Sequence, residues 1–292
     1  MRGNSLKIIY SEKCLQYSYP GHPESPERVR RASELLTESG YAFLEPKPAS
    51  EEDLLRVHNR DWVEVVRRGG FIDADTPGAG NIYEYATLAA GGATVAATLL
   101  GFSLMRPPGH HAGRSGRALG ASTVGFCYFN NIAIAVRCLN EPTLILDIDG
   151  HHGNGTQEIF LRDSKVTYVS LHRSPHYPST GLISENNCLN FPLPFDAGDE
   201  EYLKTFDEAL RHVDMKPVEV IAISAGFDAH KGDLASLGLT SDCYREIGNR
   251  LRNLGKRVFG VLEGGYSGEN IARDLGELIG GIEGRERSGR TV

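Results

Sequence analysis

Short apolar runs alternate along this chain with segments in which apolar residues recur at helical spacing. The runs are bounded by turn-forming residues and predict β-strands at residues 102–105, 144–148, 166–171, 218–224 and 258–262. Helices are predicted between them, for example at 202–213 and 242–254. Strands and helices that alternate in this way build right-handed βαβ units. The pattern therefore predicts an α/β fold whose mostly parallel sheet is covered by helices on both faces.

The residues before the first of these runs predict one strand and three helices. We expect the strand at residues 6–10 and the helices at 25–40, 50–69 and 81–100. Ser25 and Pro26 suit the start of the first helix, and Ser50 with Asp53 forms a capping box for the second. Most of the third lies within Tyr85–Met105, a segment that has no charged residue but is rich in Ala, Gly and Thr. This weakly apolar composition favours a buried helix over a membrane span.

The composition narrows the class of protein. The 292 residues are 40% hydrophobic and 24% charged, which is typical of a soluble globular enzyme, and we expect a single domain over residues 1–292. A net charge of −7 without a run of Lys or Arg argues against nucleic-acid binding by bulk electrostatics. The five cysteines form no C-x-x-C pair and no export signal is present, so we expect a reduced, cytoplasmic protein.

Chemically active side chains follow four of the predicted strands. In chain order, these side chains are His110 and His111, then Asp149 and His151, then Asp228, and finally Tyr266. Parallel sheets bind ligands outside the carboxyl ends of their strands. We therefore expect these groups to meet at one edge of the sheet.

The segment LDIDGHHGNGTQ has the pattern of a metal site. Asp147, Asp149 and His151 occupy alternate positions, and side chains two apart in an extended backbone point the same way. Carboxylate oxygen and neutral imidazole nitrogen are ligands that Zn²⁺ accepts. With Asp228, three ligands would hold one ion and leave a position open for water and a substrate carbonyl. The alternative interpretation is that the acids are merely solvated at the end of a strand.

The remaining groups suit hydrolysis at such an ion. The His110-His111 pair titrates nearest neutrality and could transfer protons, while Asp147 is placed to hold one imidazole in a single tautomer. Tyr266 could donate a hydrogen bond to a developing oxyanion. An isolated His-His pair would otherwise be an ordinary turn after Pro-Pro-Gly.

Six ordered motifs resemble the zinc-dependent histone deacetylase family, which includes acetoin-utilisation proteins and acetylpolyamine amidohydrolases. The motifs are RPPGHHAG, GFCYFNNIAIA, LDIDGHHGNGTQ, VSLH, SAGFDAH and LEGGY, and HHGNGTQ with HPESPERV looks like the class II branch. The resemblance runs from the first strand to about Leu278. It implies the three-layer arginase/deacetylase fold, with a parallel eight-stranded sheet between helices and a narrow tunnel to zinc.

The resemblance assigns the catalytic roles. It makes Asp149, His151 and Asp228 the ligands of one zinc ion per chain. It makes His111 the general base and acid and Tyr266 the oxyanion donor, with His110 as an electrostatic partner held by Asp147. The partner of His111 is Asn154, where many class I relatives have aspartate, so its imidazolium should be less stabilised.

The resemblance also implies substrate and potassium sites. The substrate residues are Asp75 at the rim, Gly125, Phe126 and Tyr177 in the tunnel, and Gly264. Tyr177 replaces a common Phe and adds a hydroxyl. The potassium site would use the side chains of Asp147 and Ser170 and the backbone oxygens of Asp149, His151 and Leu171.

The leading hypothesis is a zinc amidohydrolase that deacylates acetyl-lysine peptides or proteins, or acetylpolyamines. Loops 17–24 and 71–81 would decide the substrate. The alternatives are a deacylase of another small-molecule amide, a two-metal ureohydrolase, and a non-catalytic module that binds acyl-lysine or polyamine. Neither a membrane nor a nucleic acid is an expected partner, and a homo-oligomer is compatible with the sequence.

Overall fold

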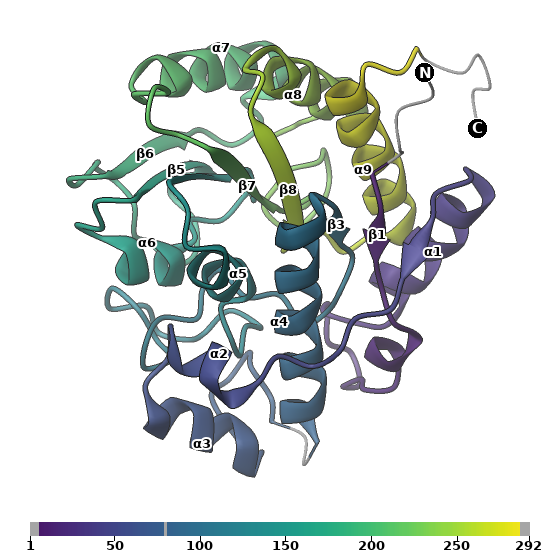
Figure 1. Cartoon of the computed structure of the whole chain (residues 1–292), viewed down its shortest axis with the longest axis vertical. Helices are drawn as coiled ribbons and strands as arrows, with labels where there is room; N and C mark the ends of the chain where they lie inside the picture. Colours follow the sequence, from purple (N-terminus) through teal and green to yellow (C-terminus); the bar gives the residue numbers. More distant parts are fainter. Residues whose placement is uncertain (1–5, 79–80, 287–292) are drawn as a thin grey trace.

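An eight-stranded, fully parallel sheet forms the centre of the computed structural model, which describes residues 6–78 and 81–286 (Figure 1). The strand order is β2-β1-β3-β8-β7-β4-β5-β6. The strands are β1 (Ile8–Ile9), β2 (Phe43–Leu44), β3 (Phe102–Ser103), β4 (Thr143–Asp147), β5 (Val166–Arg173), β6 (Cys188–Leu193), β7 (Val220–Ala225) and β8 (Arg257–Leu262). The expectation of an α/β fold around a parallel eight-stranded sheet is confirmed.

Helices cover both faces of this sheet. One face packs mainly against α1 (Glu27–Glu38), α7 (Gly198–Arg211), α8 (Ser241–Asn253) and α9 (Gly268–Glu283). The other packs mainly against α2 (Glu51–Leu55), α3 (Arg60–Arg68), α4 (Ile82–Leu99), α5 (Asn131–Leu139) and α6 (Asn154–Phe160). A short 3-10 helix, η1 (Glu12–Leu15), follows β1.

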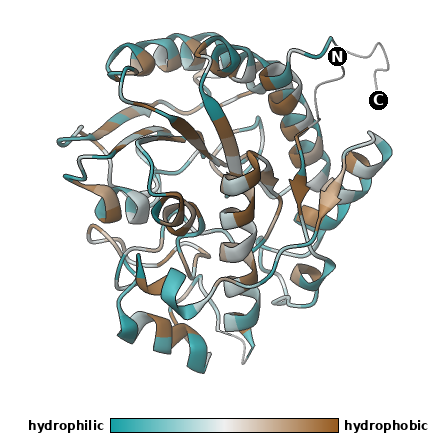
Figure 2. Ribbon diagram, in the orientation of Figure 1, coloured by the Kyte–Doolittle hydropathy of each residue, from teal (hydrophilic) through white to brown (hydrophobic). Residues whose placement is uncertain are grey.

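The alternation of side chains along the strands separates the two cores. In β4, Leu144 and Leu146 point into one core and Ile145 points into the other, and all three are fully buried. Figure 2 shows the consequence, with apolar strands in the centre and hydrophilic residues on the outer sides of the helices. Among the helices of the described ranges, none combines the length and apolar character that a membrane span requires.

Two local predictions near the N-terminus need correction. The segment 50–69 is not one helix, because Asn59 takes an extended backbone (φ −72°, ψ 160°) and its side chain accepts a hydrogen bond from Trp62 N, which starts α3. The capping box of Ser50 and Asp53 is present at α2. At α1, Pro26 has helical angles, but no side-chain hydrogen bond caps the first turn.

The prediction of one domain over 1–292 stays a prediction, since residues 1–5, 79–80 and 287–292 lie outside the described part.

A buried charged cluster ties the start of the chain to the sheet edge where the site lies. Glu24 accepts hydrogen bonds from Arg106 Nε (2.7 Å), which follows β3, and from Arg28 Nη1 (3.0 Å) on α1. Arg28 also donates to the backbone oxygens of Glu263 and Gly265. Burial alone would raise the pKa of Glu24, but Arg106 and Arg28 outweigh it and lower that pKa. The stabilisation is therefore present above the ordinary carboxyl pKa of about 4.3 and is lost as pH falls through the lowered value.

We predict that Glu24→Ala lowers the free energy of unfolding by about 3–5 kcal/mol, because it leaves two guanidinium groups buried without their carboxylate. Urea unfolding at pH 7 measures this change. The matched control is Glu27→Ala, whose carboxylate pairs with Arg30 at the surface and should change stability by less than about 1 kcal/mol. Equal effects of the two substitutions would contradict the structural importance of the cluster.

Candidate functional site

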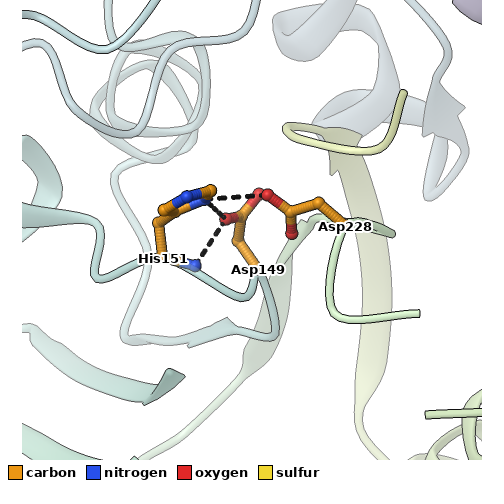
Figure 3. A group of neighbouring side chains, drawn as sticks. All are labelled: Asp149, His151 and Asp228. Carbon is orange, nitrogen blue, oxygen red and sulfur yellow. Dashed lines mark hydrogen bonds and ion pairs between the residues drawn. The ribbon is translucent and has the colours of Figure 1, made fainter. Parts of the chain in front are cut away.

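Three metal-ligating side chains meet at the carboxyl ends of two adjacent strands. Asp149 and His151 follow β4, and Asp228 follows β7, which pairs with β4 in parallel. One ligand atom from each residue lies within 4.8 Å of the others, and all three residues are buried. His151 Nδ1 is 3.2 Å from Asp149 Oδ1 and 2.8 Å from Asp228 Oδ2 (Figure 3). Side chains far apart in the sequence thus form one compact donor set.

Backbone N–H groups orient the two carboxylates. Gly264 N donates to Asp149 Oδ2 (2.7 Å), and Gly150 N donates to Asp228 Oδ1 (2.8 Å). Asp228 Oδ2 is buried and makes no hydrogen bond within the described ranges, although it lies close to His151. A buried carboxylate oxygen without a partner is costly. Its position beside two further donor atoms fits a divalent cation.

Gly264 is required by the close approach of its backbone to this donor set. A Cβ atom at this position would lie 2.5 Å from Asp228 Oδ2 and 2.6 Å from Asp149 Oδ2. Both distances are shorter than side-chain contacts allow. Any other residue would therefore push the carboxylates away from the site.

Two neighbouring histidines are each held by a different partner. Asn154 Nδ2 donates to Ala118 O (2.9 Å), so its oxygen faces His111 Nδ1 at 2.7 Å and accepts the proton of that nitrogen. His111 Nε2 is consequently left as an acceptor. His110 Nδ1 lies 3.1 Å from Asp147 Oδ2.

The pKa values of the two histidines are shifted in opposite directions. Burial alone would lower the pKa of His110, but the carboxylates of Asp149 and Asp147 outweigh burial and raise it to about 10. Burial and the adjacent His110 lower the pKa of His111 well below its ordinary value. These shifts favour the charged form of His110 and the neutral form of His111.

A cavity of about 270 Å³ opens onto the donor set and onto both histidines. Of the residues implied by the resemblance, it is lined by Asp75, Gly125, Phe126, Tyr177, Gly264 and Tyr266. The added hydroxyl of Tyr177 donates to Thr123 O (3.1 Å). Asp147, Asn154, Ser170 and Leu171 lie behind the lining.

The structure adds two groups that the sequence analysis missed. Glu263 is fully buried, and one carboxylate oxygen accepts hydrogen bonds from the backbone of Gly109 (2.7 Å) and His110 (3.0 Å). Burial raises the pKa of Glu263 to about 7 against the opposing effect of His110. Tyr168 donates its hydroxyl to Asp147 Oδ2 (2.9 Å). Glu263 lies in the LEGGY motif and could have been singled out there, whereas Tyr168 has no distinguishing signal within its strand.

Comparisons with known proteins agree with this architecture. The protein-family model described as "Histone deacetylase domain" matches residues 22–282. A "Probable deacetylase" of Archaeoglobus fulgidus is 40% identical, covering 90% of this chain and 81% of its own length. A "Histone deacetylase-like amidohydrolase" of Pseudomonas aeruginosa is 37% identical over 85% of this chain and 73% of its own. The crystal structure of the HDA15 HD domain superposes with a TM-score of 0.87 at 30% identity, covering 99% of this chain and 92% of that one.

We predict that Asp228→Ala weakens Zn²⁺ binding by more than about 100-fold, because even the loss of a residue that only supports a metal ligand costs about 10–100-fold. Isothermal titration of the metal-free protein measures the affinity. Asp61→Ala removes an exposed carboxylate from α3 and should bind Zn²⁺ like the wild type. If Asp228→Ala retains wild-type affinity, the donor set is not a metal site.

Proposed function

The chain belongs to the histone deacetylase family, and we propose that it is a zinc-dependent amidohydrolase which removes acetyl or another short acyl group from N-acylated amines. The observation that carries this proposal is the meeting of three elements at one cavity. Asp149 and His151 of the donor set, the imidazole of His111 held as an acceptor, and Tyr266 all line the same cavity. Together these groups supply a metal site, a proton acceptor and an oxyanion donor, which are the parts needed for metal-assisted hydrolysis of an amide.

The residues divide the chemistry among them. A zinc ion held by Asp149, His151 and Asp228 would supply a Lewis acid that polarises an amide carbonyl and lowers the pKa of water. His111 Nε2 takes a proton from the attacking water and returns it to the leaving amine as the C–N bond breaks. Tyr266 donates a hydrogen bond to the oxyanion.

Three supporting residues complete this assignment. Asn154 keeps the proton of His111 on Nδ1, so that Nε2 stays available to the substrate. Phe126 and Tyr177 form apolar walls that exclude water from the acyl group.

We propose a potassium ion behind this site, bound by Asp147 and Ser170 with the backbone oxygens of Asp149, His151 and Leu171. Asp147 and Ser170 are register partners on β4 and β5. His172 Nε2 lies 3.1 Å from the oxygen of Gly181 and must donate to it, so Nδ1 accepts the hydroxyl hydrogen of Ser170 (2.9 Å). The lone pairs of Ser170 Oγ are thereby left for a cation.

Two other activities are less well supported. A ureohydrolase needs ligands for two metals, whereas one group of three metal-ligating residues occurs in the described part of the chain. A non-catalytic binding module would not need a histidine held in one tautomer beside the donor set.

The cytoplasm is the proposed location, in keeping with five cysteines that are all free.

We predict turnover of acetyl-lysine peptides, acetylputrescine or acetylspermidine that is abolished by a chelator and restored by Zn²⁺. Amine release on each substrate ranks the substrate classes, and elemental analysis should give one zinc per chain. A chelator that leaves the rate unchanged would falsify the metal mechanism. Binding of these compounds without turnover would favour the binding module.

We predict that Tyr266→Phe lowers kcat by about 10²-fold or more while zinc content stays at the wild-type level, because only the oxyanion hydrogen bond is lost. Steady-state kinetics and elemental analysis of the same preparation measure both quantities. An unchanged kcat would exclude Tyr266 from the mechanism.

A further inference from the structure

The aromatic wall of the cavity has an unusual backbone conformation. Phe126 has φ +66°, in the left-handed region that non-glycine residues rarely adopt, and it follows Gly125 with φ +57°. Such a conformation costs roughly 1–3 kcal/mol and persists only where the surroundings enforce it. The Phe126 ring packs edge-on against Tyr266 (5.9 Å between centroids) and against His22 (4.5 Å). A shift of this backbone would therefore move one wall of the cavity.

Two side chains from a distant loop add to the local turn hydrogen bond in holding this conformation. Phe126 N donates to Thr76 Oγ1 (3.1 Å), and Val124 N donates to Asp73 Oδ2 (2.8 Å). Thr76 is fully buried and Asp73 is 9% exposed. Both belong to the segment between α3 and α4, whereas Phe126 lies between β3 and α5. The turn is thus held both by its own backbone hydrogen bond, from Cys127 N to Val124 O (3.1 Å), and by side chains from a distant segment.

The same segment also holds the opposite wall. Thr123 Oγ1 donates to Asp75 Oδ2 (2.6 Å), and the Tyr177 hydroxyl donates to Thr123 O (3.1 Å). Residues 73–76 therefore connect to both Phe126 and Tyr177. They contact neither the metal-ligating side chains nor the two histidines through any hydrogen bond in the described ranges.

We infer that Thr76, assisted by Asp73, is a positioning residue that holds Phe126 in its left-handed conformation and thereby sets the fit of the acyl group in the cavity. The inference rests on the proposed function. It predicts an effect on substrate binding and acyl selectivity rather than on the chemical step, because the proton-transfer groups are held by other residues.

The test is Thr76→Val, which keeps the shape of the side chain and removes the acceptor for Phe126 N. It also removes the hydroxyl that donates to Asp75 Oδ1 (3.0 Å), and the comparison with the Phe126→Ala background separates the two effects. We expect KM to rise by about 2–10-fold, the range set by one net hydrogen bond, with kcat within about 2-fold of wild type. The ratio of kcat/KM for acetyl and butyryl substrates should change. Thr76→Ser keeps the hydroxyl and should restore wild-type KM. Thermal unfolding of each variant confirms that it folds, and Thr76→Ala replaces Thr76→Val if the latter is recovered unfolded.

A double-mutant cycle with Phe126→Ala separates positioning from a general structural effect. If Thr76 acts through the Phe126 ring, Thr76→Val changes KM in the wild-type background and not in the Phe126→Ala background. An equal change in both backgrounds, or a fall in kcat alone, overturns the inference.

A crystal structure of Thr76→Val gives a result that does not depend on activity. Departure of Phe126 from positive φ supports the inference, and an unchanged Phe126 overturns it. Failure of the proposed function would instead appear as an inactive wild type with Phe126 in its expected conformation.

Discussion

The parallel register of β4 with its two neighbours is the constraint on which the site depends. Asp147 pairs with Ser170 of β5 on one side and with Ser224 of β7 on the other. The chain leaves the sheet immediately after Asp147, so Asp149 emerges at the edge where Asp228 follows β7. A slip of one residue would turn each side chain of β4 to the opposite face and separate the ligands. The packing of the two cores against alternate residues of β4 prevents that slip.

Three buried carboxylates lie at this edge of the sheet, and backbone N–H groups stabilise them in a way that suits cation binding. Asp149, Asp228 and Glu263 all accept hydrogen bonds from backbone N–H groups. In the described ranges, none of the three accepts a side-chain hydrogen bond from Lys or Arg. Backbone N–H groups stabilise these carboxylates with partial charges rather than with the full charge of a Lys or Arg side chain. The backbone must approach these carboxylates closely to donate its N–H groups. The glycines of the GHHGNG and EGGY segments allow this approach and so help to stabilise the carboxylates.

The sequence was sufficient for the features that depend on local pattern. Apolar runs located the strands near the centre of the sheet, and the residues that follow them supplied the donor set and both histidines. The break at Asn59 was missed because helical spacing continues across it, while a single side-chain cap decides the local structure. Glu263 and Tyr168 were missed for a different reason. Their roles depend on contacts with His110 and Asp147, which tertiary folding alone brings near.

The cavity walls depend on weaker constraints than the catalytic edge. Sheet register and buried backbone hydrogen bonds hold Asp149 and Asp228, whereas the conformation of Phe126 depends on one turn hydrogen bond and on side-chain acceptors in residues 73–76. One such bond contributes about 0.5–1.5 kcal/mol, which is comparable with the roughly 1–3 kcal/mol cost of a left-handed residue. A single substitution in that loop can therefore change the shape of the cavity while the ligands stay in place. Under the proposed function, acyl selectivity is the property that substitutions in this loop would change while the metal-ligating side chains keep their positions.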